Sequence, residues 1–123
     1  MSAFLSPLQA EVLPGSSPIR WVLLSALIYQ SDVLGAAICV PKGFSTDLAS
    51  VPRLPLVYML TANVVSEPAV VHDYLYSQAS VPRDVADRVF LEAMAAEGVS
   101  WVRRQAMYLA VRAFGWRYYG GRA

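Results

Sequence analysis

The chain has 123 residues, of which 56% are hydrophobic and 15% are charged, and its formal net charge is +1. This length fits one domain with its own core and is too short for two. So small a net charge argues against a nucleic-acid partner, and the single cysteine, Cys39, excludes an internal disulfide and a cysteine-based zinc site.

The N-terminal third predicts strands. Residues 1–18 are rich in serine and proline, which predicts an irregular N-terminal arm. Two apolar segments follow, 19–30 and 33–40, and their β-branched and aromatic content is typical of strands. Ser31 and Asp32 between them are turn residues, so the pair predicts a β-hairpin or meander. The polar segment after Gly43 is expected to be a loop as far as Arg53.

Three or four helices are predicted after this loop. A short one is expected over 54–60. Ser66 is a typical N-cap and Pro68 a typical first-turn residue, so they predict a helix that reaches about Ser77.

Two further helices complete the prediction. One begins after residues 80–82 and stops at Gly98. Ser100 caps the last one, which ends near Phe114. Its predicted inner stripe consists of apolar residues at helical spacing: Val102, Ala106, Leu109, Ala110 and Ala113.

These elements predict a small α+β domain over residues 19–115, with an N-terminal hairpin or meander and three to four packed helices, followed by a basic aromatic tail over 116–123. No stretch has the roughly 18 uninterrupted apolar residues of a spanning helix. The N-terminus also lacks the basic start and apolar block of a secretion signal, so we expect synthesis in a cytoplasm. The apolar surplus favours a contact with another subunit or a second copy over a lipid surface.

The residues best suited to chemistry lie on two consecutive predicted helices. His72, the single histidine, precedes Asp73, and Tyr76 lies one turn further on the same helix face. The next helix should pack antiparallel after a short connection, which can bring Asp87 against His72 or Tyr76. Arg83 lies one turn before Asp87 and could pair with it.

This set could perform general-base chemistry or hold a metal ion. His72 could take a proton from water while Asp87 holds its other ring nitrogen and Tyr76 fixes Asp87. Asp73 could bind calcium or another divalent cation through its oxygens.

The same residues also have a structural interpretation. A histidine beside an aspartate is most often a hydrogen-bonded pair in a small domain, and Arg83 and Asp87 have the spacing of an ordinary surface ion pair. In the loop, Asp47 with Thr46 and Ser50 is typical of an Asx-type turn that satisfies its own backbone.

Three blocks of sequence occur in the order found in a known family. VPKGFSTDLASVPR (40–53), VHDYLY (71–76) and the segment 83–94 resemble the phage and prophage family catalogued as domain of unknown function 1353. The resemblance extends from about Ile19 to Gly115. It implies a phage or prophage protein that is made in the bacterial host cytoplasm and is a candidate for incorporation in the virion. It implies no established activity.

A narrower resemblance concerns the two helices. His72-Asp73-x-x-Tyr76 followed by Asp87-x-x-Phe90 is similar to the helix pair of phospholipase A2 enzymes, especially the disulfide-free type carried on parvovirus capsids. It implies that His72 activates water, that Asp73 binds calcium, and that Tyr76 and Asp87 support the histidine.

The calcium site implied by this resemblance lacks one part. The glycine-rich calcium loop of that family has no counterpart between Thr61 and Val71. Asp47 and loop carbonyls would have to supply the missing oxygens, with Thr46, Ser50 and Arg53 as the supporting loop residues.

Two interpretations from different classes follow. In the first, the protein is a cation-assisted hydrolase of the host envelope with His72 as general base. In the second, it is a non-catalytic component of the tail, baseplate or neck, whose partners are other virion subunits or further copies. An enzyme predicts an open cleft at His72, Asp73 and Asp87, whereas a structural role predicts that these side chains are buried and hydrogen-bonded.

Overall fold

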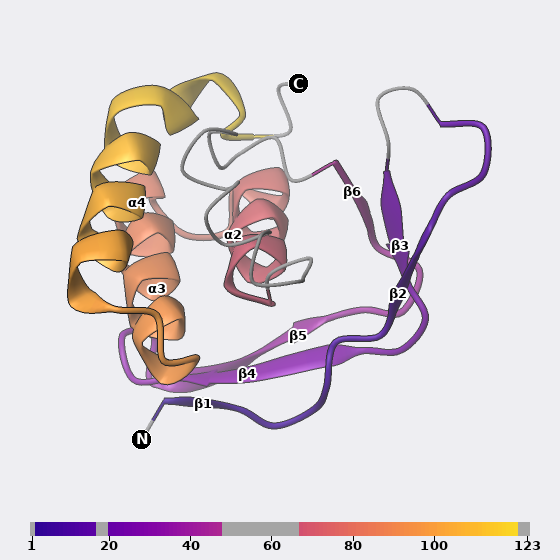
Figure 1. Cartoon of the computed structure of the whole chain (residues 1–123), viewed down its shortest axis with the longest axis horizontal. Helices are drawn as coiled ribbons and strands as arrows, with labels where there is room; N and C mark the ends of the chain where they lie inside the picture. Colours follow the sequence, from indigo (N-terminus) through magenta and orange to yellow (C-terminus); the bar gives the residue numbers. More distant parts are fainter. Residues whose placement is uncertain (1, 17–19, 48–66, 121–123) are drawn as a thin grey trace.

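Six short strands precede three helices in the part of the chain that the computed structural model describes, residues 2–16, 20–47 and 67–120. The strands pair antiparallel in two sheets, with the orders β1-β4-β5 and β2-β3-β6. Their bounds are β1 (Ala3–Phe4), β2 (Ala10–Val12), β3 (Trp21–Leu23), β4 (Leu27–Ser31), β5 (Ala36–Val40) and β6 (Ser45–Thr46). The first sheet lies beneath the helices and the second lies to one side (Figure 1). The predicted α+β class is confirmed.

The β4–β5 hairpin forms one wall of the core. Along β4, Leu27, Tyr29 and Ser31 are buried and the residues between them are partly exposed, as in a strand with one face on the core. β5 pairs with β4 from Leu27, opposite Val40, as far as Ser31. The predicted hairpin is confirmed, with Ser31 in the strand and not in the turn.

Two strands lie in the N-terminal segment that the sequence predicts to be irregular. β1 pairs with β4, and β2 pairs with β3. Between them, the Ser6 hydroxyl donates to the Ala26 carbonyl at 3.1 Å and accepts from the Ile28 N–H at 2.9 Å. The prediction of an irregular arm over 1–18 is therefore wrong for β1 and β2. The serine and proline content of this segment does not indicate whether its backbone pairs with strands further along the sequence.

The predicted single strand over 19–30 is two strands in different sheets. β3 ends at Leu23 and β4 begins at Leu27. Between them, the Leu24 N–H donates to the Gln9 carbonyl at 2.7 Å as the chain passes from one sheet to the other. Ser25 is the one polar residue of this crossing, and a single serine does not distinguish a break between two strands from one continuous strand.

The three helices are α2 (Glu67–Gln78), α3 (Arg83–Ala96) and α4 (Trp101–Phe114), and the 3-10 turn η1 (Gly115–Arg117) follows α4. At the start of α4, the Ser100 side chain accepts from the Arg103 N–H, and Gly98 follows α3 with a φ of 80°. Both signals are as predicted. The helix expected over 54–60 and the Ser66 cap lie outside the described residues.

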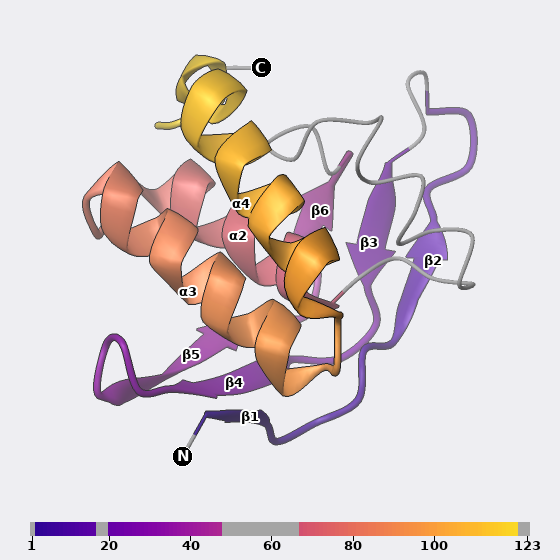
Figure 2. The same cartoon turned by 60° about the vertical axis from the view of Figure 1, so that its left-hand side comes forward.

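α3 packs against both α2 and α4, and α4 passes in front of α2 in the view of Figure 2. It contributes Phe90, Ala93 and Met94 to the core, where α2 contributes Val70 and Val71. This core lies between the helices and the β4–β5 hairpin. Within the described ranges, no helix is long and apolar enough to cross a membrane.

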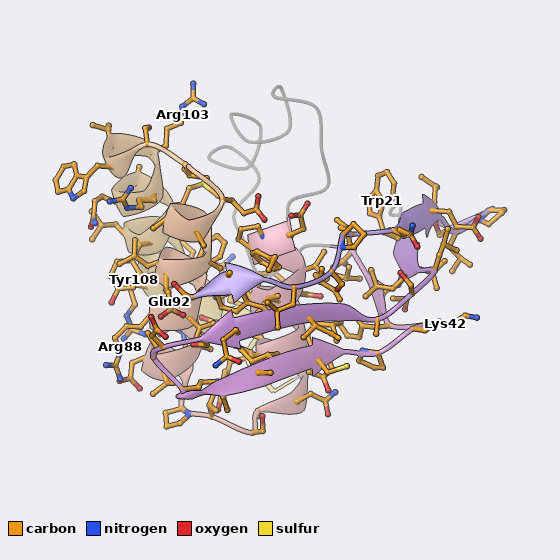
Figure 3. All side chains as sticks on the ribbon, turned by 90° about the horizontal axis from the view of Figure 1, so that it is seen from below. Trp21, Lys42, Arg88, Glu92, Arg103 and Tyr108 are labelled. Atoms are coloured by element: carbon orange, nitrogen blue, oxygen red, sulfur yellow. The ribbon has the colours of Figure 1, made fainter. Side chains whose placement is uncertain are left out.

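Glu92 of α3 connects the helical layer to the hairpin. Its Oε1 accepts from the hydroxyls of Tyr29 and Ser31, both at 2.8 Å, and its Oε2 accepts from the N–H groups of Asp32 and Val33 at 3.1 and 3.0 Å. One carboxylate thus binds both the end of β4 and the turn after it. Glu92 lies at this end of the sheet in Figure 3.

α4 faces the core with a different side from the one predicted. Its buried residues are Met107 and Val111, whereas Val102 and Leu109 of the predicted inner stripe are exposed. Both sets have helical spacing, so periodicity does not distinguish them. The face that packs on α3 also carries Arg112, whose guanidinium bonds to that helix.

Candidate functional site

His72 is fully buried between α2 and α3. Its ring lies against the rings of Tyr76 and Phe90, with centroid distances of 4.1 and 4.8 Å. Its Nε2 atom is 2.7 Å from Oδ1 of Asp87, which is also fully buried. Because an ionised carboxylate only accepts hydrogen bonds, Nε2 carries the proton and donates it. The predicted approach of Asp87 to His72 is confirmed.

Tyr76 and Arg112 complete the hydrogen bonds of the Asp87 carboxylate. The Tyr76 hydroxyl donates to Oδ1 at 2.6 Å, as predicted from its place one turn after His72. The Arg112 guanidinium, from α4, donates to Oδ2 at 2.8 Å. Three donors from α2 and α4 therefore converge on one buried carboxylate of α3.

Arg83 pairs less closely with Asp87 than Arg112 does. Its guanidinium is 4.0 Å from Oδ2, and its Nε donates to the Tyr76 hydroxyl at 3.0 Å. It also donates to the carbonyls of Val111 and Arg112 in the last turn of α4. The Val111 carbonyl also accepts from the Gly115 N–H at the C-cap. Arg83 therefore adds a cationic donor to the last turn of α4, where positive charge is favourable. We call His72, Tyr76, Arg83, Asp87 and Arg112 the Asp87 cluster.

The ionisation of the cluster follows from its contacts. Burial by itself raises the pKa of Asp87, but the hydrogen bonds from His72, Tyr76 and Arg112 outweigh burial and hold the pKa of this carboxyl below its usual range. Burial and the adjacent Asp87 raise the pKa of the Tyr76 hydroxyl. The same carboxylate raises the pKa of Arg112. The cluster is thus a carboxylate with a cationic and a phenolic partner across neutral pH.

A second polar contact joins α2 to β6. The Thr46 hydroxyl donates to Oδ2 of Asp73, and Asp47 pairs with Arg20 at 3.8 Å. The predicted proximity of the loop and Asp73 is thus present through Thr46. Ser50 and Arg53, which the sequence also places at this site, lie outside the described residues.

The acids in the described part of the chain do not by themselves form a cation site. No group of three histidine, cysteine, aspartate or glutamate side chains there could hold a metal ion. Calcium takes six to eight oxygen ligands. Asp73 and Asp47 alone fall short of that number, so we derive no chemical step through a cation.

Sequence reasoning missed Arg112 and the C-terminal segment. The Tyr119 hydroxyl donates to the Val81 carbonyl at 2.6 Å, and the Gly120 N–H donates to the Tyr76 carbonyl at 2.8 Å. The residues after α4 thus pack on the corner between α2 and α3. One signal for Arg112 was available, because a buried aspartate needs a cation and α4 contains several arginines.

A family model described as a protein of unknown function (DUF1353) matches residues 21–111. No curated protein and no solved structure matches the chain.

Proposed function

The chain belongs to the family of proteins of unknown function DUF1353, and from this premise we propose that it is a non-catalytic phage or prophage protein. In this role the Asp87 cluster fastens α2, α3 and α4 together, and the domain serves as a component of the tail, baseplate or neck. Its partners are other virion subunits or further copies of the chain. The phage setting is supported by the resemblance of its three sequence blocks.

The burial of His72 and Asp87 is the observation that supports this proposal. Both side chains are 0% exposed, and the cluster provides hydrogen bonds to both carboxylate oxygens. A general base needs a substrate proton within about 3 Å. A buried pair whose hydrogen bonds are satisfied within the fold stabilises it, and a substrate cannot reach that pair.

Removing the charge of Asp87 tests the proposal. We expect Asp87→Asn to lower the free energy of unfolding by about 3 kcal/mol, because it removes the charge that pairs with Arg112 and replaces one acceptor oxygen by an NH2 group that faces another donor. Urea unfolding at neutral pH measures this loss. The matched control is Asp84→Asn on the same helix, whose exposed pair with Arg88 at 3.7 Å should change stability by less than about 0.5 kcal/mol.

His72→Ala separates a structural role from a catalytic one. We expect a loss of about 1–3 kcal/mol from stranding its buried partner. An activity that disappears in this variant while its stability stays at the wild-type value would overturn the proposal.

An envelope hydrolase is the second candidate, and one observation favours it. His72 and Tyr76 both donate to Oδ1 of Asp87, which is the supporting arrangement that the phospholipase A2 resemblance implies. In this candidate His72 is the general base and Asp87 and Tyr76 hold its ring. Asp73 is its cation ligand, with Asp47 as the nearby acid of the adjoining strand end.

Calcium titration by calorimetry, on the wild type and Asp73→Asn, tests this candidate. Binding that is lost in the variant, together with calcium-dependent phospholipid hydrolysis by the wild type, would establish it. Absence of both binding and turnover would eliminate it and leave the structural role.

A further inference from the structure

The outward face of α4 is apolar. Val102 and Leu109 are 71% and 65% exposed, and Ala106 and Ala113 are exposed beside them at helical spacing. We call these four residues the outer stripe. α4 lies on the outside of the helical layer, with α3 against its other face (Figure 2). A helix that is apolar on both faces is typical of one that is buried on both.

Two aromatic side chains flank this apolar surface. Trp101 and Phe114, at the two ends of α4, are each more than half exposed, and helical spacing places them on opposite sides of the outer stripe. Together with the four residues of the stripe they offer roughly 600 Å² per protomer. A standard interface takes about 800 Å² from each partner, and total burial above about 1,000 Å² is expected of a biological contact. The face is therefore large enough for a stable partner.

We propose that a second copy of the chain covers this face, with the two α4 helices antiparallel about a two-fold axis. If the axis passes between residues 107 and 108, Val102 lies opposite the partner's Ala113 and Ala106 lies opposite the partner's Leu109. Each large side chain then meets an alanine, so the two surfaces interdigitate. The same two pairs recur across the axis, as a two-fold interface requires.

Charge does not oppose this pairing. The outer stripe has no charged residue, and Arg103 and Arg112 are nine positions apart, which places them on opposite sides of the helix. Arg103 points away from the molecule (Figure 3). Because like flanks face each other in an antiparallel pair, Arg103 lies near the partner's Phe114, where cation–π contact is favourable. Arg112 is held by Asp87 within its own chain.

The exposure of the outer stripe is independent of the proposed function. The outer stripe lies on the side of α4 away from the Asp87 cluster, so the stripe would remain exposed whatever the cluster does.

Sedimentation velocity between about 1 µM and 200 µM tests the proposal. We expect the wild type to form dimers and Leu109→Glu to be monomeric with unchanged circular dichroism. The matched control is Leu5→Glu, because Leu5 is 63% exposed but lies beside the sheet. This variant should dimerise like the wild type.

A size swap tests the antiparallel register. Leu109→Ala leaves two alanines facing each other and Ala106→Leu makes two leucines collide, so each should weaken the dimer at least about tenfold. The double variant Ala106→Leu/Leu109→Ala restores one large and one small residue in each pair and should recover most of that loss. A double variant no better than the single ones would overturn the register.

Other occupants of the face would appear in the same experiments. A wild type that stays monomeric at every concentration overturns the proposal. If that monomer binds phosphatidylglycerol vesicles and Leu109→Glu does not, the face is a lipid surface. Dimers that Leu109→Glu leaves intact would place the contact on another face, which also overturns the proposal.

Discussion

Among single residues, Asp87 is the one that contacts every other member of the cluster. Its low pKa means that its interactions stabilise the fold above the ordinary aspartate pKa of 3.8 and are lost as the pH falls through the lowered value. A cluster of this kind therefore persists across the whole neutral range. The histidine contributes to the same contact, because its Nε2–H donates from α2 to Asp87 on α3.

Gly115 is the residue that makes room for Tyr76. A Cβ at this position would lie 2.8 Å from the Tyr76 hydroxyl oxygen and 3.2 Å from its ring. We expect Gly115→Ala to lower the free energy of unfolding by about 1–3 kcal/mol, because the tyrosine must move away from Asp87. Urea unfolding measures this loss.

A double-mutant cycle with Tyr76→Phe identifies the cause of that loss. The phenylalanine lacks the oxygen that the new methyl group meets, so the two substitutions together should cost less than the sum of their separate effects. Additive effects would show that Gly115 acts through something other than this contact.

For helices and strands, the sequence predicts where an element ends more reliably than it predicts which neighbour the element packs against. Ser100 and Gly98 mark helix ends through their own backbone chemistry, and the sequence predicts both. Which face of α4 is buried depends on the residues of α3 that it packs against. Periodicity does not reveal this, because Met107 and Val111 have the same helical spacing as the outer stripe. Likewise, the break between β3 and β4 is set by strand pairing far away in the sequence.

In the candidate site, too, the contacts between neighbouring helices were predictable and the contact from α4 was not. Helical spacing is enough to join His72, Tyr76 and Asp87, since they lie on neighbouring helices. Arg112 comes from a third helix, so its contact with Asp87 depends on the direction in which α4 faces. The anchoring role of Glu92 depends on a hairpin some sixty positions earlier and has no local signal.

The start of α2 meets the end of α3 through two acids. Burial, then the hydrogen bond and charge of Glu97, raise the pKa of Glu67 to about 7 from an ordinary value of 4.5. The folded state therefore binds more protons than the unfolded state between these pH values. Stability from this contact is present below about 4.5 and falls as the pH rises towards 7.

Replacing Glu67 tests this dependence. We expect Glu67→Gln to remove the fall, so its free energy of unfolding should rise relative to the wild type as the pH increases from 4.5 to 7. Unfolding by urea at several pH values provides the measurement. Glu11→Gln, at an exposed position on β2, is the control and should track the wild type. Parallel curves for the wild type and Glu67→Gln would contradict the prediction.

At the scale of the whole molecule, charge is divided along the chain. Residues 98–123 contain five arginines and no acid, whereas residues 1–97 contain the other five basic residues and all nine acids. The net charge of the chain is near zero, but its C-terminal part is positive and the rest is negative, so the two parts attract each other electrostatically. Arg112 with Asp87 is the most direct contact between the two parts.

The C-terminal segment adds to the fold, although the sequence predicts a separate tail over 116–123. We expect deletion of residues 118–123 to cost about 2–4 kcal/mol, because it removes the partly buried Tyr119 and the two hydrogen bonds to Val81 and Tyr76. Thermal or urea unfolding in the Leu109→Glu background keeps self-association out of the comparison. An unchanged stability would show that the segment is dispensable.

The position of Arg112 in the chain also has a consequence in time. It follows Asp87 by 25 residues, an interval that a ribosome takes about 1–5 s to synthesise. During that interval α2 and α3 can already join His72 to Oδ1 of Asp87, whereas Oδ2 has the Arg83 guanidinium at 4.0 Å and still lacks the 2.8 Å hydrogen bond from Arg112. We therefore expect the Asp87 cluster of a nascent chain to be complete only once α4 has been made.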